Sequence, residues 1–351
     1  MEKGYKILGN YIRLVDERNK NLAVTKLLGV SISKKFIPSI ANIVGTDLSN
    51  YKIVRTGQFA YGPVTSRNGE KISIAYLDLD KEDCIISSSY TVFEVENKEE
   101  LDPEYLMLWF SRPEFDRYAR YKSHGSVREI FDWNELCMVE LPVPDIEKQR
   151  KIVKAYKKIT DRIALKQKIN DNLESMLTAV YFEQFYSSKA SEYTKLSDLM
   201  VFGNGKSRPK TNGTIPVYGG NGVLSYTDKH NVENTVLIGR VGAYCGSVYL
   251  EQSICWVSDN AIFAKSKITN DEFFDYFLLK GLNLFIHHVG TGQQLLTQDI
   301  LNNIEVPKPD IEQIGLFNMK AKSVFETISA NKCEIIRLQK LSDLLLARLA
   351  S

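Results

Sequence analysis

The sequence lacks any long hydrophobic run. No stretch approaches the roughly 20 consecutive apolar residues that a membrane-spanning helix requires. Residues 1–5, MEKGY, also lack the apolar core of a signal peptide. These two absences predict a cytoplasmic protein with no membrane partner.

Cysteine and histidine are scarce and scattered. The five cysteines form no CxxC pair, and the four histidines are not at metal-ligand spacing from the cysteines or from one another. We therefore predict no structural zinc and no other metal site. Four scattered histidines also give no basis for a Ser-His-Asp catalytic grouping.

Motifs of the common nucleotide and nucleic-acid enzymes are missing as well. The GKS at 205–207 lacks the glycine of a phosphate loop, because Met200 stands five positions before Gly205. The acidic PDIEK at 144–148 imitates a nuclease cluster, but helix capping explains it better, and its second copy has Gln313 instead of lysine. No Asn-Pro-Pro-aromatic element of base amino-methylation occurs. We predict that this chain alone is not an enzyme and holds no cofactor.

The composition is that of an ordinary globular protein. Of 351 residues, 44% are apolar and 25% are charged, which allows two domains plus connecting elements. The net charge of +2 does not by itself indicate nucleic-acid binding, but a balanced total can hide a basic stripe.

One segment occurs twice. The sequence LPVPDIE at 141–147 returns as VPKPDIE at 306–312, and a shift of 165 positions superimposes the copies without a gap. In each copy a Pro-x-Pro pair enforces an extended backbone. Asp145 and Asp310 then stand where a helix N-cap belongs. Gapless agreement over about fifty positions is the signature of an internal repeat.

Long helices are predicted after both copies. The two runs contain no proline, and their apolar residues recur in steps of four and three, which is typical of a coiled coil. A run of roughly 38 residues makes a helix about 55–60 Å long. The predicted seam consists of Ile152, Ile159, Lys166, Leu173 and Val180 in the first run, and Phe317, Val324, Asn331, Leu338 and Leu345 in the second.

The chain therefore alternates domain, helix, domain, helix. The predicted boundaries are 1–141 and 187–306 for the two domains, and 142–186 and 307–351 for the two helical segments. Strand-like and helical stretches mix in both domains, so the predicted fold class is α+β or mixed α/β. If the termini of the second domain lie close together, the second helix runs antiparallel to the first. Two similar domains then lie at opposite ends of the helices, related by a pseudo-two-fold axis.

A polar residue at a seam position often determines helix alignment. We therefore predict a register that sets Lys166 opposite Asn331, and with it Ile159 opposite Leu338.

Local patterns predict further elements. Strands are expected at 51–54, 72–78, 90–95, 236–239 and 262–264, helices at 102–110 and 273–279, and loops at 67–70, 203–210, 218–222 and 240–246.

The repeat order and several short motifs resemble the specificity subunit of type I restriction-modification systems. The segments 215–222, 238–242 and 256–261 are similar to those of its target-recognition domains, and 88–93 is a weaker counterpart in the first domain. The second helix departs from the family pattern, because EQIG at 312–315 replaces the usual Glu-Gln-basic run.

This resemblance implies a subunit without catalysis that reads a split double-stranded DNA site. Each domain would read one half, while the helices set the spacer and dock partners. The implied partners are two methyltransferase subunits, which use S-adenosylmethionine. The resemblance also implies two motor-nuclease subunits, which use ATP and Mg, where the host system includes them.

Loop residues able to bind bases or phosphates are the candidate site. In the first domain they are Arg67, Asn68, Arg120, Tyr121, Lys122, Ser123, Ser126 and Arg128. In the second they are Lys206, Ser207, Arg208, Lys210, Asn221, Arg240, Tyr244, Gln293 and Gln294. For each one, a solvated loop side chain is the alternative.

Two questions stay open at this level. The basic run of the first helix could contact DNA phosphates or be solvated; it consists of Lys148, Arg150, Lys151, Lys154, Lys157 and Lys158. The alternative function is a coiled-coil adaptor whose domains bind proteins rather than DNA. A self-contained methyltransferase or nuclease would require activity from this chain alone.

Overall fold

The structure is a computed structural model, and two compact units make up the part of the chain it describes. The described residues are 4–40, 45–66, 68–125, 128–186, 192–290 and 292–350. The first unit consists of 4–165 with 335–350, and the second of 166–334. Both long helices contribute residues to both units, so the sequence-based domain boundaries remain predictions.

The long helices begin at the repeated motif. They are α4 (Ile146–Tyr186) and α8 (Ile311–Ala347). The Oδ1 atom of Asp145 accepts a hydrogen bond from the Lys148 amide at 2.9 Å, and Oδ1 of Asp310 accepts one from the Glu312 amide at 2.9 Å. These side chains satisfy amides that the first helical turn leaves without partners. The capping interpretation of the acidic clusters is therefore confirmed.

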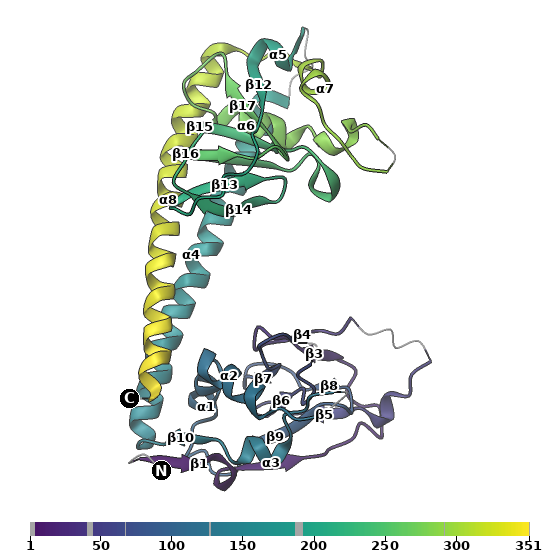
Figure 1. Ribbon diagram of the computed structural model, residues 1–351, viewed down its shortest axis with the longest axis vertical. Coiled ribbons are helices and arrows are strands. Elements are labelled where there is room, and N and C mark those ends of the chain that lie inside the picture. Colours follow the sequence, from purple (N-terminus) through teal and green to yellow (C-terminus); the bar gives the residue numbers. More distant parts are fainter. Residues whose placement is uncertain are drawn as a thin grey trace. The chain divides into compact units, whose positions relative to one another are not determined.

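The first unit is built on short antiparallel strands (Figure 1). They are β1 (Tyr5–Ile7), β2 (Ile12–Val15), β3 (Leu28–Val30), β4 (Phe36–Pro38), β5 (Lys52–Val54), β6 (Phe59–Tyr61), β7 (Ile74–Tyr76), β8 (Cys84–Ile86), β9 (Thr91–Val95) and β10 (Glu140–Pro142). Its shorter helices are α1 (Pro103–Phe110), α2 (Pro113–Lys122) and α3 (Trp133–Cys137). The main sheet has the order β2-β9-β6-β7, and β1 pairs with β10, β3 with β4, and β5 with β8.

Aromatic side chains fill the core of this unit. The rings of Phe59 and Phe93 stack with centroids 4.8 Å apart, and Phe110 of α1 meets both edge-on. Leu349 from the end of the chain belongs to the same core. Burying such side chains stabilises each by roughly 1.5–3 kcal/mol.

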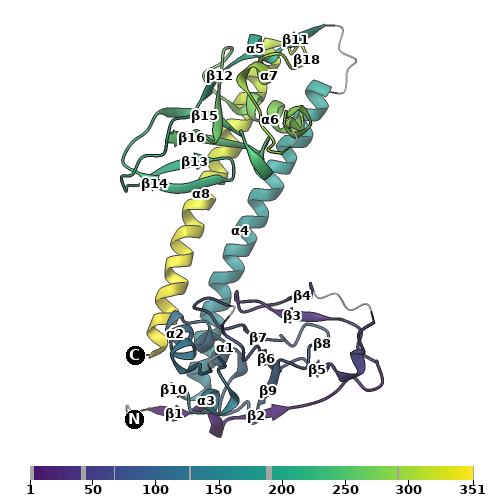
Figure 2. The same cartoon turned by 45° about the vertical axis from the view of Figure 1, so that its right-hand side comes forward.

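The second unit contains one six-stranded mixed sheet (Figure 2). Its strands are β11 (Tyr193–Lys195), β12 (Met200–Asn204), β13 (Ile215–Gly219), β14 (Gly222–Thr227), β15 (Val232–Gly239), β16 (Val248–Val257), β17 (Ala261–Ser266) and β18 (Glu305–Pro307). Its shorter helices are α5 (Leu196–Leu199), α6 (Phe273–Gly281) and α7 (Gln298–Asn302). The sheet order is β12-β17-β15-β16-β13-β14, with only β13 and β16 parallel, while β11 pairs with β18.

Helix residues and domain residues share one core in this unit. Tyr181 of α4 lies 5.7 Å from Phe274 and 6.0 Å from Phe277 of α6, and 5.8 Å from Phe317 of α8, between ring centroids. The domain therefore packs directly on the helix pair.

Within the second unit the helices run antiparallel in the expected register. The Nζ atom of Lys166 lies 2.7 Å from Oδ1 of Asn331, and Nδ2 of Asn331 donates to Oδ1 of Asn170 at 2.9 Å. Farther along α4, Tyr181 meets Phe317, so the numbering rises on one helix as it falls on the other. All ten predicted seam residues are buried or half-buried.

The mixed α/β fold class with two long helices is confirmed. Two predicted loops need correction. Gly203 and Asn204 are the last residues of β12 rather than loop, and 218–222 is a tight hairpin that joins β13 to β14. Glycine-rich sequence suggested loops here, but hydrogen-bonded neighbours extend the strands into them. Within the described ranges, every helix is too short or too polar to span a membrane.

Candidate nucleic-acid interface

Five backbone segments of the second unit come together in what we call the loop cluster. It consists of 204–210, 218–222, 239–246, 258–261, and 289–290 with 292–296. The amide of Lys206 donates to the Val257 carbonyl at 2.9 Å, and the Ser258 amide donates to the Tyr218 carbonyl at 2.9 Å. The segment around Ser258 therefore joins the two segments that carry Lys206 and Asn221.

The other two segments are attached in the same way. The Arg240 amide donates to the Asn260 carbonyl at 3.0 Å, and the Gly242 amide donates to the Gln294 carbonyl at 3.0 Å. The structure thus brings together candidate residues that lie almost ninety positions apart, between Lys206 and Gln294.

Close packing in the loop cluster requires glycine at position 205. A Cβ atom there would lie 1.9 Å from the Ser258 carbonyl oxygen. The glycine that imitates a phosphate loop therefore serves backbone packing.

An exposed arm follows Lys206. Ser207, Arg208 and Lys210 are all exposed, and none of them forms an ion pair with another described residue. The arm is tied down after Lys210, where the Thr211 hydroxyl lies 2.8 Å from that of Thr227. Cations on an anchored but solvated arm suit contact with a polyanion.

Tyr218 lies at the base of the loop cluster as a neutral phenol. Its hydroxyl donates to Oε2 of Glu251 at 2.9 Å. Burial, and secondly the charge of Glu251, raise the pKa of Tyr218 above its ordinary value. The tyrosine therefore stays protonated and acts as a hydrogen-bond donor.

A matching backbone arrangement occurs in the first unit, and we call it the shared frame. Three backbone hydrogen bonds of the first unit each have a counterpart in the second. The Gly62 amide donates to the Ser73 carbonyl at 2.9 Å, and the Gly239 amide to the Ser247 carbonyl at 2.8 Å. In the same way, Thr65 donates to Glu129 and Gly242 to Gln294, both at 3.0 Å, while Phe131 donates to Pro63 and Leu296 to Arg240, both at 2.9 Å. In both units a turn beside these segments is closed by a bridge, His124 with Ile130 and Val289 with Leu295.

The turns of the shared frame need glycine at their first position. Gly125 has φ +136° and Gly290 has φ +92°. A Cβ would lie 2.1 Å from the Arg128 carbonyl in one and 2.4 Å from the Gln293 carbonyl in the other. Arg128 and Gln293, both exposed, occupy corresponding places in these turns.

Sequence reasoning did not find the segment of the first unit that corresponds to the segment around Arg240. Val64 corresponds to Val241, a displacement of 177 positions, whereas Ile130 corresponds to Leu295, a displacement of 165. Because the displacement changes within the domain, a gapless comparison cannot match both segments. The missed position is Pro63, which corresponds to Arg240.

Several candidates of the first unit have partners inside the protein. Arg120 forms an ion pair with Glu129, and Nζ of Lys122 lies 3.5 Å from Glu135. The Ser123 hydroxyl accepts a hydrogen bond from Thr65 at 2.9 Å and donates to the Ala119 carbonyl.

The remaining candidates differ in exposure. Tyr121 is 81% exposed, while Asn68 is half-buried and donates to the Val64 carbonyl at 3.3 Å. Arg67 and Ser126 lie outside the described residues. In the second unit Asn221 and Tyr244 are exposed and Gln294 is half-buried. These placements leave the assignment of DNA contacts as a prediction.

Part of the basic run on α4 is neutralised within the first unit. Arg150 lies 2.7 Å from Glu99, and Lys157 lies 2.6 Å from Glu104. Two of the six cations therefore bind carboxylates of the neighbouring domain.

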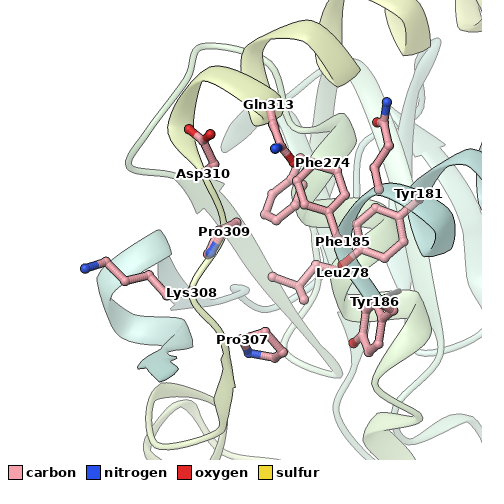
Figure 3. A pocket seen from close by; sticks show the side chains of 11 residues that line it. Tyr181, Phe185, Tyr186, Phe274, Leu278, Pro307, Lys308, Pro309, Asp310 and Gln313 are labelled. Carbon is pink, nitrogen blue, oxygen red and sulfur yellow. The ribbon is translucent and has the colours of Figure 1, made fainter. Parts of the chain in front are cut away.

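A cavity of about 170 Å³ lies between the end of α4 and the start of α8 (Figure 3). Tyr181, Phe185 and Phe274 form an aromatic wall, and Asp310 and Gln313 add polar groups. The Asp310 carboxylate that lines this cavity also caps α8. The described residues also include no group of three or more metal-ligating side chains.

Comparison with protein families gives a direct match. The family model described as "Type I restriction modification DNA specificity domain" matches residues 31–175 and again 189–342. The specificity subunit of the HindI type I restriction enzyme of Haemophilus influenzae is 24% identical over 160 residues, which cover 45% of this chain and 34% of that protein. The chain therefore matches about a third of the length of this relative. The MjaIX specificity subunit of Methanocaldococcus jannaschii is 24% identical over 299 residues, 70% of this chain and 68% of that one.

Solved structures agree on the fold. The S subunit of a type I restriction-modification system from M. genitalium gives a TM-score of 0.64 at 15% identity and covers 99% of this chain and 96% of its own. A structure described as the basis of complex assembly and conformational transition of the type I R-M system gives 0.50 at 18% identity, with 98% and 96% covered.

Proposed function

Because this chain belongs to the type I restriction-modification DNA specificity family, we propose that it is the non-catalytic targeting subunit of such a complex. Each domain reads one half of a bipartite double-stranded DNA target. The single observation that carries this proposal is the shared frame, which holds equivalent backbone in both units but offers different side chains. Two readers with one construction and different polar groups suit two different half-sites.

The helices set the spacer and receive the partner subunits. Exposed apolar side chains support docking: in the second unit Leu316 and Met319 of α8 are 49% and 64% exposed, and in the first unit Leu344 is 61% exposed. Clusters of exposed apolar residues mark protein interfaces more often than isolated ones do. The partners are two methyltransferase subunits that bring S-adenosylmethionine. Motor-nuclease subunits with ATP and Mg join where the system includes them.

The exposed arm of the second domain supplies phosphate contacts in this proposal. Lys206→Ala and Arg208→Ala should each weaken DNA binding by the complex assembled with its methyltransferase partner. Each lost phosphate contact lowers the slope of log K against log salt by about one unit. Affinity should fall similarly for all sequences, because phosphates carry no sequence information.

Lys267→Ala is the matched control. Lys267 is also an exposed lysine, but it follows the opposite end of β17 from Ala261, which joins the loop cluster. It should leave the salt slope unchanged. If the assembled wild-type complex does not shift duplex DNA at all, the adaptor function is favoured instead.

A further inference from the structure

We propose that Arg240 is the side chain with which the second domain recognises a guanine in its half of the DNA target. This inference rests on the proposed function, because it assigns one determinant of specificity within that DNA-reading surface.

Within the shared frame, the two units have the same backbone arrangement at position 240 and its counterpart but different side chains. The Leu296 amide binds the Arg240 carbonyl at 2.9 Å, and the Phe131 amide binds the Pro63 carbonyl at 2.9 Å. The main chain is therefore held alike, while one domain presents a guanidinium and the other a pyrrolidine ring. Proline offers no side-chain hydrogen bond, whereas arginine offers five donors. Domains that read different bases on one frame must differ at such positions.

A neighbouring position of the frame also differs between the two units. Glu129 of the first unit corresponds to Gln294 of the second, and the main-chain carbonyl of each accepts a hydrogen bond of the frame. Glu129 forms an ion pair with Arg120 of the same unit. In the second unit the corresponding side chain, Gln294, is uncharged.

Among the described residues, the guanidinium of Arg240 has no hydrogen-bond or ion-pair partner. The residue is half-buried, and its Nε atom is buried with no hydrogen-bond partner among the described residues. Its terminal nitrogens also have no partner among these residues and are not fully buried, so their donors remain within reach of a ligand. A buried donor left unsatisfied costs about 1–3 kcal/mol. Binding of a hydrogen-bond acceptor at such a site is therefore expected to be favourable in free energy.

The surroundings favour a base over a phosphate. Arg240 is half-buried among the segments of the loop cluster, whereas Arg208 stands on a solvated arm. A restricted guanidinium loses less freedom on binding and holds one direction, which suits the paired acceptors O6 and N7 of guanine. A long, solvated side chain suits a phosphate, which accepts from many directions.

The test uses the chain assembled with its methyltransferase partner and duplexes in which each base of the wild-type target is varied in turn. Arg240→Lys keeps the charge but loses the planar pair of donors. It should lower the discrimination for guanine at one position of one half-site by roughly 5- to 150-fold. Discrimination in the other half-site should not change. Arg240→Gln should give the same pattern, and the thermal midpoint of each variant reports folding.

Arg208→Ala is the contrasting control, because it should lower DNA affinity equally for all sequences. If Arg240→Lys weakens binding uniformly with no change in base preference, Arg240 contacts phosphate and the inference is wrong. If the variant keeps the full wild-type preference, Arg240 contacts nothing and the inference is equally wrong. A wild-type complex without a split motif contradicts the proposed function itself, which separates the two failures.

Discussion

Lys166 of α4 and Asn331 of α8 occupy the same position of the internal repeat, and their side chains meet at 2.7 Å. Asn331 is 8% exposed, and Lys166 also lies 2.7 Å from Glu334. A polar contact inside an apolar seam contributes little to stability, but it penalises shifted alignments that bury either group without a partner. Within the second unit, the contact of Tyr181 with Phe317 fits the same register.

We predict that these two residues are energetically coupled. Lys166→Met leaves Asn331 with fewer partners, and Asn331→Leu removes one acceptor of a half-buried ammonium group. Each single change should destabilise the protein, while the double change should recover part of the loss. The expected coupling is about 0.5–3 kcal/mol, measured from urea unfolding of the four proteins. Lys168→Met, at an exposed site of the same helix, should be nearly neutral. Simple additivity of the two single changes would show that the contact does not determine register.

The glycine turns of the shared frame give a second prediction. Gly290→Ala places a Cβ 2.4 Å from the Gln293 carbonyl at a φ of +92°, so the turn must rearrange. We expect a local cost of about 1–3 kcal/mol and weaker DNA binding by the assembled complex. Gly292→Ala meets nothing within 4 Å and is the matched control in the same turn. Equal DNA affinity of the two variants would exclude this turn from the interface.

Gly315 should be replaceable with a gain in stability. It lies inside α8, and an added Cβ meets no atom within 4 Å. Gly315→Ala should therefore raise the thermal midpoint of the isolated chain, with a gain of about 0.5–1 kcal/mol. Gly281→Ala offers a contrast, because its Cβ would lie 3.3 Å from the Phe182 ring. A lower midpoint for Gly315→Ala would mean that the helix is strained at that turn.

A buried acid in α6 predicts a pH dependence of stability. Asp275 is 2% exposed, and its Oδ2 atom has no hydrogen-bond partner among the described residues. Burial, and secondly the charge of Glu272, raise the pKa of Asp275 well above its ordinary value. The folded protein thus retains a proton that the unfolded chain has released at neutral pH. This stabilising contribution is complete below the ordinary pKa of aspartate and is lost as pH rises through the raised pKa.

Asp275→Asn should flatten that dependence. The amide needs no proton, so the variant should gain about 1–3 kcal/mol over the wild type as the pH becomes alkaline. Unfolding midpoints measured from acidic to alkaline pH test this. Asp271→Asn, at a partly exposed site nearby, should follow the wild-type curve. Parallel curves for Asp275→Asn and wild type would show that Asp275 is ionised in the folded state.

The helices could be predicted because their signals are local or repeated. Asp145 and Asp310 cap amides within a few residues of themselves, so the motif alone predicts each helix start. The register followed from two polar residues at matched repeat positions, Lys166 and Asn331, since a seam tolerates few such residues.

The arrangement of the candidate site could not be predicted in the same way. Arg240 and Gln294 are brought together by the sheet order and by the hydrogen bonds of the Gly242 and Leu296 amides, which no local pattern encodes. Pro63 was missed because the spacing between frame segments differs between the domains. Arg120 and Ser123 have suitable chemistry for DNA, but the fold gives them partners within the protein.

The central claim is that two domains read separate parts of one DNA site. Sequencing methylated adenines in DNA from cells that express this chain with its methyltransferase partner tests it most directly. We predict two short sequences separated by a gap of fixed length, and a change in only one of them when the loop cluster of the second domain is altered. A single continuous motif, or methylation without sequence preference, would contradict the account.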